Sequence, residues 1–149
     1  MITLNKEEIS NLISINPPFL MIDSGHEIIP GKSSVALLEL NPDLWFFDSH
    51  LKQEKVMPAA LLTEAMLQTI ILGIYTYSNC KGYIPFIVKT ECNFTNRVSA
   101  GCVIRFIAQI EYIKRGIIEG SVTGQIFDKQ VCDGKFKFVI PQLSIVPKK

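Results

Sequence analysis

The sequence has little charge of either sign. Only 19% of its 149 residues are charged, and 15 basic residues against 14 acidic ones leave a net charge of +1. Nucleic acid and anionic membranes attract proteins through an excess of positive charge. We therefore expect no nucleic-acid partner and no electrostatic binding to a membrane.

The cysteines also lack any metal-binding spacing. The four stand at positions 80, 92, 102 and 132, none of them in a C-x-x-C motif, and the two histidines lie far from them. We interpret the cysteines as reduced thiols of a cytoplasmic protein, and we expect no metal and no bound cofactor.

A membrane-spanning segment is absent as well. The N-terminal residues 1–8 have acidic residues where a signal peptide needs apolar ones. The longest apolar run, Ala59–Tyr77, contains Glu64 and Gln68, and a glutamate at the bilayer centre costs roughly 2–3 kcal/mol or more. We interpret this run as a helix buried in protein, with no membrane span.

Apolar residues, by contrast, make up 48% of the chain. That share predicts extensive burial and a subunit interface in a single domain over residues 1–149. Asn5 and Glu8 form a capping box at the start of a first helix, which Asn16-Pro17-Pro18 ends. Pro58 suits the first turn of a long helix that runs to about Tyr77.

Most of the remaining segments are rich in β-branched and aromatic residues and are predicted to be strands. These are Phe19–Ile22, Ser33–Leu40, Tyr83–Phe94, Cys102–Lys114, Ile117–Phe127 and Val131–Val146. Asp23-Ser24-Gly25 is typical of a turn or bulge, Pro30-Gly31 of a turn, Asp133-Gly134 of a bulge or further turn, and Asn41–Lys55 of irregular structure. The order predicts an α+β fold in which an antiparallel sheet wraps one central helix.

His50 and Glu64 are the candidate catalytic residues. An ionisable carboxyl in an apolar helix is costly to bury unless something compensates. A histidine just upstream is the side chain best suited to move a proton near neutral pH. The pair suggests acid–base chemistry on a largely apolar substrate. His26 has no acid partner in any motif, and we interpret it as structural.

Several segments, in one register, resemble a known family. Pro18–Asp23 resembles Y-P-F-L-L-V-D, Phe46–His50 resembles F-F-x-G-H, Val56–Ala59 and Glu64–Gln68 resemble V-M-P-G and E-A-L-A-Q, and Phe94–Gly101 resembles F-x-x-P-V-x-P-G. These are motifs of the β-hydroxyacyl-(acyl carrier protein) dehydratases of the FabZ type, which have the hot-dog fold. The resemblance covers nearly the whole chain and is that of a divergent member.

The resemblance implies a role for each matching residue. His50 aligns with the catalytic histidine and Glu64 with the catalytic glutamate, while Gln68 lines the same site. The substrate-binding positions also include Met57, Pro58 and Ala59, and the backbone N–H of Ala59 would bind the thioester carbonyl. His50 would remove the α-proton, and Glu64 would protonate the departing hydroxyl if it stays un-ionised.

The resemblance also implies partners. The substrate would be carried on the phosphopantetheine of an acyl carrier protein. The two catalytic side chains would come from different subunits of a homodimer with shared active sites, and three such dimers could assemble into a trimer of dimers. Candidates for a basic rim that helps an acidic carrier dock are Lys52, Lys55, Arg97, Lys114 and Arg115.

The strongest family motif, G-H-F-P-G-H-P-x-M-P-G, is only partly retained. His50, Met57 and Pro58 remain, but both loop prolines, the second histidine and all three glycines are replaced. The changed loop at residues 51–55 suggests an unusual substrate or reduced activity. Two alternatives stay open: an acyl-binding subunit that is non-catalytic or pairs with another chain, and a thioesterase in which Glu64 activates water.

Overall fold

The long apolar run forms the central helix of the molecule, α3 (Ala59–Tyr75). The computed structural model describes residues 1–51 and 53–144. The side of α3 that faces the sheet is apolar and buried, with Leu62, Ala65, Met66 and Ile70 at most 3% exposed. Each large apolar side chain buried in this way contributes about 1.5–3 kcal/mol. Among the described residues, no helix has the length and hydropathy to span a bilayer.

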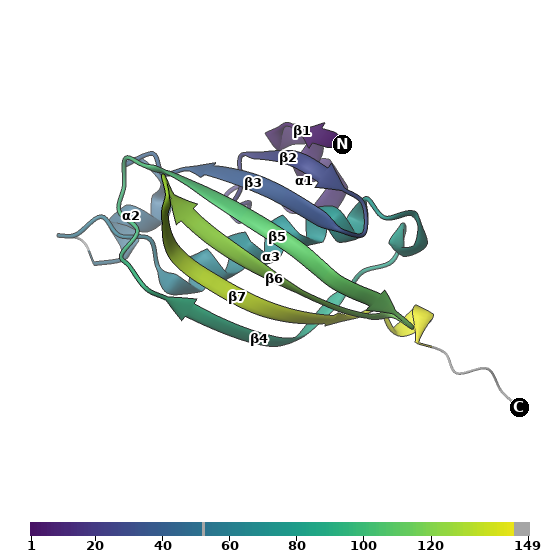
Figure 1. Cartoon of the computed structure of the whole chain (residues 1–149). Coiled ribbons are helices and arrows are strands. Elements are labelled where there is room, and N and C mark those ends of the chain that lie inside the picture. The colour runs from purple at the N-terminus through teal and green to yellow at the C-terminus, as the bar shows by residue number, and fades with distance from the viewer. Residues whose placement is uncertain (52, 145–149) are drawn as a thin grey trace, which may run out of the picture.

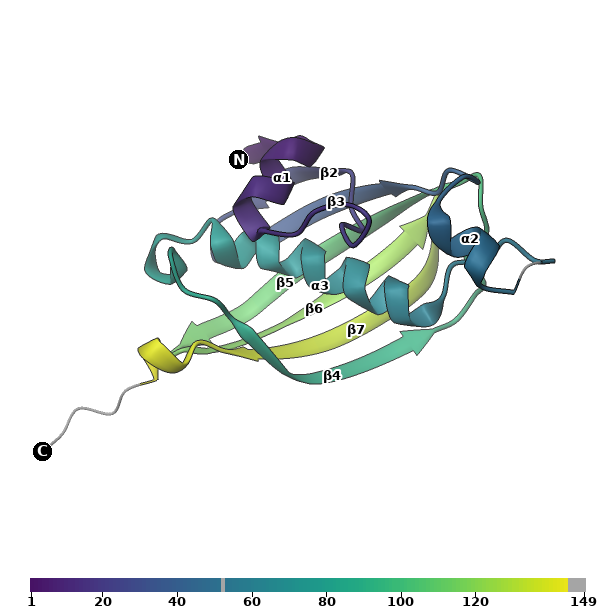
Figure 2. The same cartoon turned by 180° about the vertical axis from the view of Figure 1, so that it is seen from behind.

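One antiparallel sheet curves around α3. Its strands are β1 (Ile2–Leu4), β2 (Ser24–Ile29), β3 (Ser33–Glu39), β4 (Phe86–Phe94), β5 (Val103–Lys114), β6 (Ile117–Ile126) and β7 (Lys129–Val139), in the order β1-β2-β3-β5-β6-β7-β4. Figure 1 shows β4 as the last strand at the lower edge, and Figure 2 shows α3 on the concave side. The α+β fold with a sheet wrapped around one helix is confirmed.

Shorter elements flank the sheet and α3. They are α1 (Lys6–Ile13), α2 (Trp45–Ser49) and the single turns η1 (Ser78–Cys80) and η2 (Pro141–Leu143). The capping box of α1 is confirmed: Asn5 Oδ1 accepts from the Glu8 N–H at 2.9 Å, and Glu8 Oε1 accepts from the Asn5 N–H at 3.1 Å. α2 lies beyond the N-terminal end of α3 (Figure 2).

Close approach of α3 to the sheet depends on a glycine. A Cβ at Gly120 on β6 would lie 2.5 Å from the Gln109 carbonyl oxygen and 2.6 Å from Ile70 Cδ1. Real Cβ atoms do not approach other atoms so closely, and a carbonyl fixed in a sheet cannot move aside. Glycine at this position therefore sets how closely the helix packs.

Several sequence-based boundaries were wrong. The segment Phe19–Ile22 is not a strand, β2 already begins at Ser24, and its irregularity falls instead between His26 and Ile29. Asp133-Gly134 is neither bulge nor turn, because both residues pair in register with β4 and β6. β1 was not predicted. α2 lies within the segment predicted to be irregular. The last predicted strand ends at Val139, and residues 145 and 146 lie outside the described residues.

Candidate active site

Gln68 is the most firmly held polar side chain near the proposed site. It is fully buried on α3. Its Nε2 donates to the Phe19 carbonyl and to Glu64 Oε2, both at 2.9 Å, and its Oε1 accepts from the Met21 N–H at 2.6 Å. These bonds fix the orientation of the amide and make it a rigid donor toward Glu64.

The Glu64 carboxyl is half-buried. Burial raises its pKa above the ordinary value because the charged form loses solvation, and the hydrogen bond from Gln68 lowers it in part. Glu64 and Gln68 lie one helical turn apart, the spacing that brings side chains together on one face. A carboxyl that favours its neutral form can donate a proton.

Glu64 lies on the side of α3 that faces away from the sheet. Ala60, Leu67 and Ile71 share that side because they lie three or four residues apart along the helix. Ala60 is exposed, and Leu67 and Ile71 are half-buried. Glu64 therefore belongs to an apolar stripe of the helix that this chain covers only partly.

His50 is held by the backbone at the C-terminal end of α2. Its Nδ1 lies 3.4 Å from the Val56 carbonyl oxygen. A carbonyl only accepts hydrogen bonds, so this contact favours the tautomer with the proton on Nδ1. The lone pair then lies on Nε2, and the half-buried ring presents a base on that side.

The predicted substrate-binding residues lie at the N-terminus of α3. Pro58 is the N-cap residue, and Ala59 opens the helix. The Met57 N–H donates to the Val98 carbonyl at 2.8 Å, which attaches this segment to the residues after β4. A hollow of about 380 Å³ lies between them, lined in part by Met57, Ala59 and Val98. Free backbone N–H groups in the first turn of a helix favour a negatively charged oxygen.

The structure thus divides the predicted site into two groups. Glu64 and Gln68 lie with the segment around Phe19, whereas His50, Met57 and Ala59 lie around the start of α3. Within residues 1–51 and 53–144, no hydrogen bond joins Glu64 to His50. Glu64 is also not among the residues that line the hollow beside Ala59.

Edge strand β4 pairs only with β7 in the described sheet. Its apolar side chains are unusually exposed: Phe86 is 55%, Val88 56% and Phe94 41% accessible. Proteins normally cover or charge such an edge, since its free N–H and C=O groups invite pairing with another strand.

Comparison with known proteins gives the family. The model of the FabA-like domain matches residues 14–135, most of the chain. This chain belongs to the FabA-like family.

Two proteins that are similar in sequence have the same name. The chain is 29% identical over 138 residues to 3-hydroxyacyl-(acyl-carrier-protein) dehydratase FabZ of Ruminiclostridium cellulolyticum, covering 92% of this chain and 97% of that protein. It is 31% identical over 135 residues to the protein of the same name from Clostridium kluyveri, covering 90% and 94%. The resemblance to a divergent FabZ-type protein is therefore confirmed.

Solved structures show the fold. Zebrafish thioesterase superfamily member 2 matches with a TM-score of 0.71 at 13% identity, covering 91% of this chain and 94% of that one. Cj0977, a sigma28-regulated virulence protein from Campylobacter jejuni, matches with a TM-score of 0.68 at 15% identity, covering 92% of each. With the seven-stranded sheet around α3, these matches confirm the hot-dog fold.

The predicted basic rim residues of this FabA-like chain do not lie together within one chain. Lys114 and Arg115 lie where β5 ends, at the end of the sheet opposite α2 (Figure 1). Within one chain, the β5–β6 hairpin carries them away from the start of α3. Lys55 and Arg97 do lie near that start, since the Lys55 carbonyl accepts from Ala100 and Arg97 lines the hollow. Lys52 lies outside the described residues.

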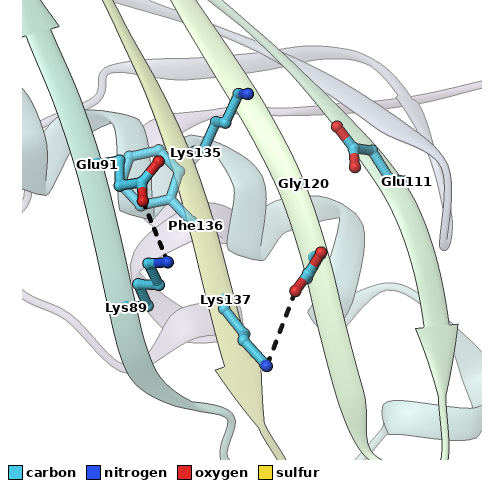
Figure 3. Close-up of a pocket in the computed structure, with 8 residues that line it drawn as sticks. Lys89, Glu91, Glu111, Gly120, Lys135, Phe136 and Lys137 are labelled. Atoms are coloured by element: carbon cyan, nitrogen blue, oxygen red, sulfur yellow. Dashed lines mark ion pairs between the residues drawn. The ribbon is translucent and has the colours of Figure 1, made fainter.

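The outer face of the sheet carries exposed charged side chains that pair with one another. Figure 3 shows lysines and glutamates from β4, β5, β6 and β7 around a shallow hollow of about 130 Å³. Lys89 pairs with Glu91 at 3.1 Å and Lys137 with Glu119 at 3.8 Å. All four side chains are exposed by a third or more, so this face is a solvated surface.

The site residues that sequence reasoning missed are backbone groups. The Phe19 carbonyl and the Met21 N–H hold Gln68, and the Val56 carbonyl lies beside His50. Main-chain groups have no residue-type signal, so only the fold could identify these partners.

Proposed function

We propose that this chain dehydrates β-hydroxyacyl thioesters on an acyl carrier protein to the trans-2-enoyl form, in fatty-acid or specialised acyl-chain biosynthesis. The observation that carries the proposal is the state of Glu64 in a FabA-like chain. This carboxyl is half-buried, its pKa is raised by burial, and Gln68 holds it in place. We also propose a cytoplasmic location, and the absence of a cofactor stays a prediction.

The chemistry uses one base, one acid and one backbone donor. His50 Nε2 removes the α-proton, and the electron pair moves onto the thioester oxygen. The Ala59 N–H at the start of α3 stabilises that oxygen as charge develops on it. The pair then returns to form the Cα=Cβ bond while the C–O bond breaks. The leaving oxygen takes its electron pair and a proton from Glu64 and departs as water, which leaves a carboxylate and an imidazolium.

We further propose that the active site lies between two copies of the chain. Two observations support a homodimer: the exposed apolar edge of β4 and the partly covered stripe of α3 that contains Glu64. Pairing of β4 with its copy would cover the edge. The same contact would enclose Glu64 and place it near the partner's His50. Within one chain, no described hydrogen bond joins Glu64 to His50.

An acyl-binding role without dehydration is the second candidate. The loop after His50 departs from the family motif, and Ala59 stands where the motif has glycine. The apolar hollow beside Ala59 would still accept an acyl thioester. Binding without turnover is the behaviour that separates this candidate from the first.

The experiment is a turnover assay with β-hydroxyacyl-carrier thioesters of several chain lengths. The unmodified protein should interconvert hydroxyacyl and enoyl forms, and His50→Ala and Glu64→Ala should each lose at least about 100-fold in rate. His26→Ala is the matched histidine control, because His26 contacts Ser24 on β2. Glu91→Ala on the outer face is the glutamate control.

Three outcomes would contradict the proposed mechanism. Equal rates in the unmodified protein and both variants would remove the proposed roles. Binding of the thioester without turnover would favour the acyl-binding role. Release of free acid that depends on Glu64 would favour a thioesterase.

A further inference from the structure

Arg97 contributes to the lining of three hollows. It lines the hollow of about 380 Å³ that reaches Ala59, a second of about 850 Å³ beside Phe127, and a third of about 420 Å³ beside Glu54. All three open to solvent. A group that approaches the start of α3 from this side therefore passes the Arg97 guanidinium.

The guanidinium of Arg97 is paired with the carboxylate of Glu54. Both side chains are exposed, Arg97 by 73% and Glu54 by 54%. An ion pair this exposed stabilises a protein by about 0–1 kcal/mol, because water solvates both partners once they separate. The Arg97 guanidinium can therefore leave the Glu54 carboxylate and bind another anion at little cost in free energy.

Other charges near Arg97 do not change this picture. Asp128 and Lys129 line the largest of the three hollows and carry opposite charges. Lys55 contacts Asp48 at 3.7 Å and the Pro42 carbonyl at 3.3 Å, and it lines none of the three hollows. Within residues 1–51 and 53–144, Arg97 is thus the one cation that lines all three hollows.

We propose that Arg97 binds the phosphate of the substrate's phosphopantetheine arm, and that Glu54 competes with that phosphate for the guanidinium. The inference rests on the proposed function, since it takes an arm of this chemistry as the part of the substrate that enters. A planar guanidinium binds two phosphate oxygens at once, and the diester phosphate of a carrier-bound arm carries one negative charge, as the Glu54 carboxylate does, so the two anions compete for the same guanidinium. Glu54 thereby sets how strongly the chain prefers a phosphorylated thiol arm.

The test compares binding of 4′-phosphopantetheine and pantetheine by isothermal titration calorimetry, which needs no turnover. The unmodified protein should bind the phosphorylated compound more tightly. Arg97→Gln should bind the two within about twofold of each other. Glu54→Gln should tighten binding of the phosphorylated compound by up to about fivefold, the factor that corresponds to removing a competitor worth at most 1 kcal/mol.

A second exposed arginine–glutamate pair supplies matched controls. Arg105 on β5 lies 3.4 Å from Glu27 on β2, and both line a different hollow. Arg105→Gln and Glu27→Gln change the same charges and should leave both affinities unaltered. A loss in Arg105→Gln equal to that in Arg97→Gln would mean that net charge alone governs binding, and would overturn the proposal.

The remaining outcomes are also decisive. No detectable preference in the unmodified protein at millimolar ligand, or an unchanged preference in Arg97→Gln, would overturn the proposal, as would weaker binding in Glu54→Gln. The predicted affinities together with absent dehydration would refute the proposed function and leave this site standing. Dehydration without the phosphate preference would refute this site and leave the proposed function standing.

Discussion

Replacement of Gln68 by leucine removes three hydrogen bonds without a large change in side-chain volume. Met21 is 2% exposed, so its N–H would lose its partner inside the protein, at a cost of about 1–3 kcal/mol. Phe19 is 52% exposed, and its carbonyl can turn to water at little cost. The half-buried Glu64 carboxyl would lose one donor and become more often protonated, which adds little to this cost. We therefore expect a loss of about 1–3 kcal/mol in the free energy of unfolding.

The assay is urea unfolding with linear extrapolation to water. Gln109→Leu is the control, because Gln109 is an exposed glutamine on β5 and should change stability by less than about 0.5 kcal/mol. A Gln68→Leu variant as stable as that control would refute the idea that Gln68 connects α3 to the segment around Phe19.

The same variant affects the chemistry in a defined direction. The hydrogen bond from Gln68 favours the Glu64 carboxylate, so its removal raises the pKa of Glu64 further above the ordinary value. Because the proposed acid must be protonated, the alkaline fall of the rate should move to higher pH. A fall that moves to lower pH would contradict the assignment of Glu64 as the acid.

Three more results are expected. Burial raises the pKa of Glu64 above its ordinary value of 4.5, so ionisation of this carboxyl opposes folding. The stability that the neutral carboxyl confers is complete below pH 4.5 and is lost as the pH rises through the raised pKa. Glu64→Gln should remove this loss, so that urea midpoints at pH about 4 and about 8 differ less than in the unmodified protein. Val88→Lys, which places a charge on the exposed edge of β4, should shift sedimentation from dimer to monomer; an unchanged dimer would exclude that edge as the interface. Gly120→Ala should destabilise the protein by about 1–3 kcal/mol in urea unfolding, because the added methyl collides with the Gln109 carbonyl and Ile70; no loss would mean that the helix can move away.

The helices were predictable because their signals are local. Asn5 and Glu8 satisfy each other within one turn, and Pro58 stands next to the start of α3. The Glu64–Gln68 contact is equally local, since side chains four residues apart lie on one face whatever surrounds the helix.

The segment Phe19–Ile22 shows where local reasoning fails. A short apolar run indicates that side chains are buried, but it does not indicate which group pairs with the backbone. Here that group is the side chain of Gln68, which lies 47 residues beyond Met21 in sequence. β1 was missed for a related reason, because a strand of three residues is too short to show alternation.

The sequence by itself determined the α+β class, the central helix, and the residue types and spacing of the candidate acid and its amide partner. Only the tertiary structure decided that Gln68 is held by Phe19 and Met21, that His50 lies beside the Val56 carbonyl, and that Arg97 rather than Lys114 lies by the start of α3. The physical reason is the range of the interactions. Helix periodicity and capping act within about a turn, whereas the Gln68 contacts and the position of Arg97 arise only when the sheet has closed around α3 and brought distant segments together. The His50 contact spans six residues of an irregular loop, which has no periodic pattern from which it could be predicted.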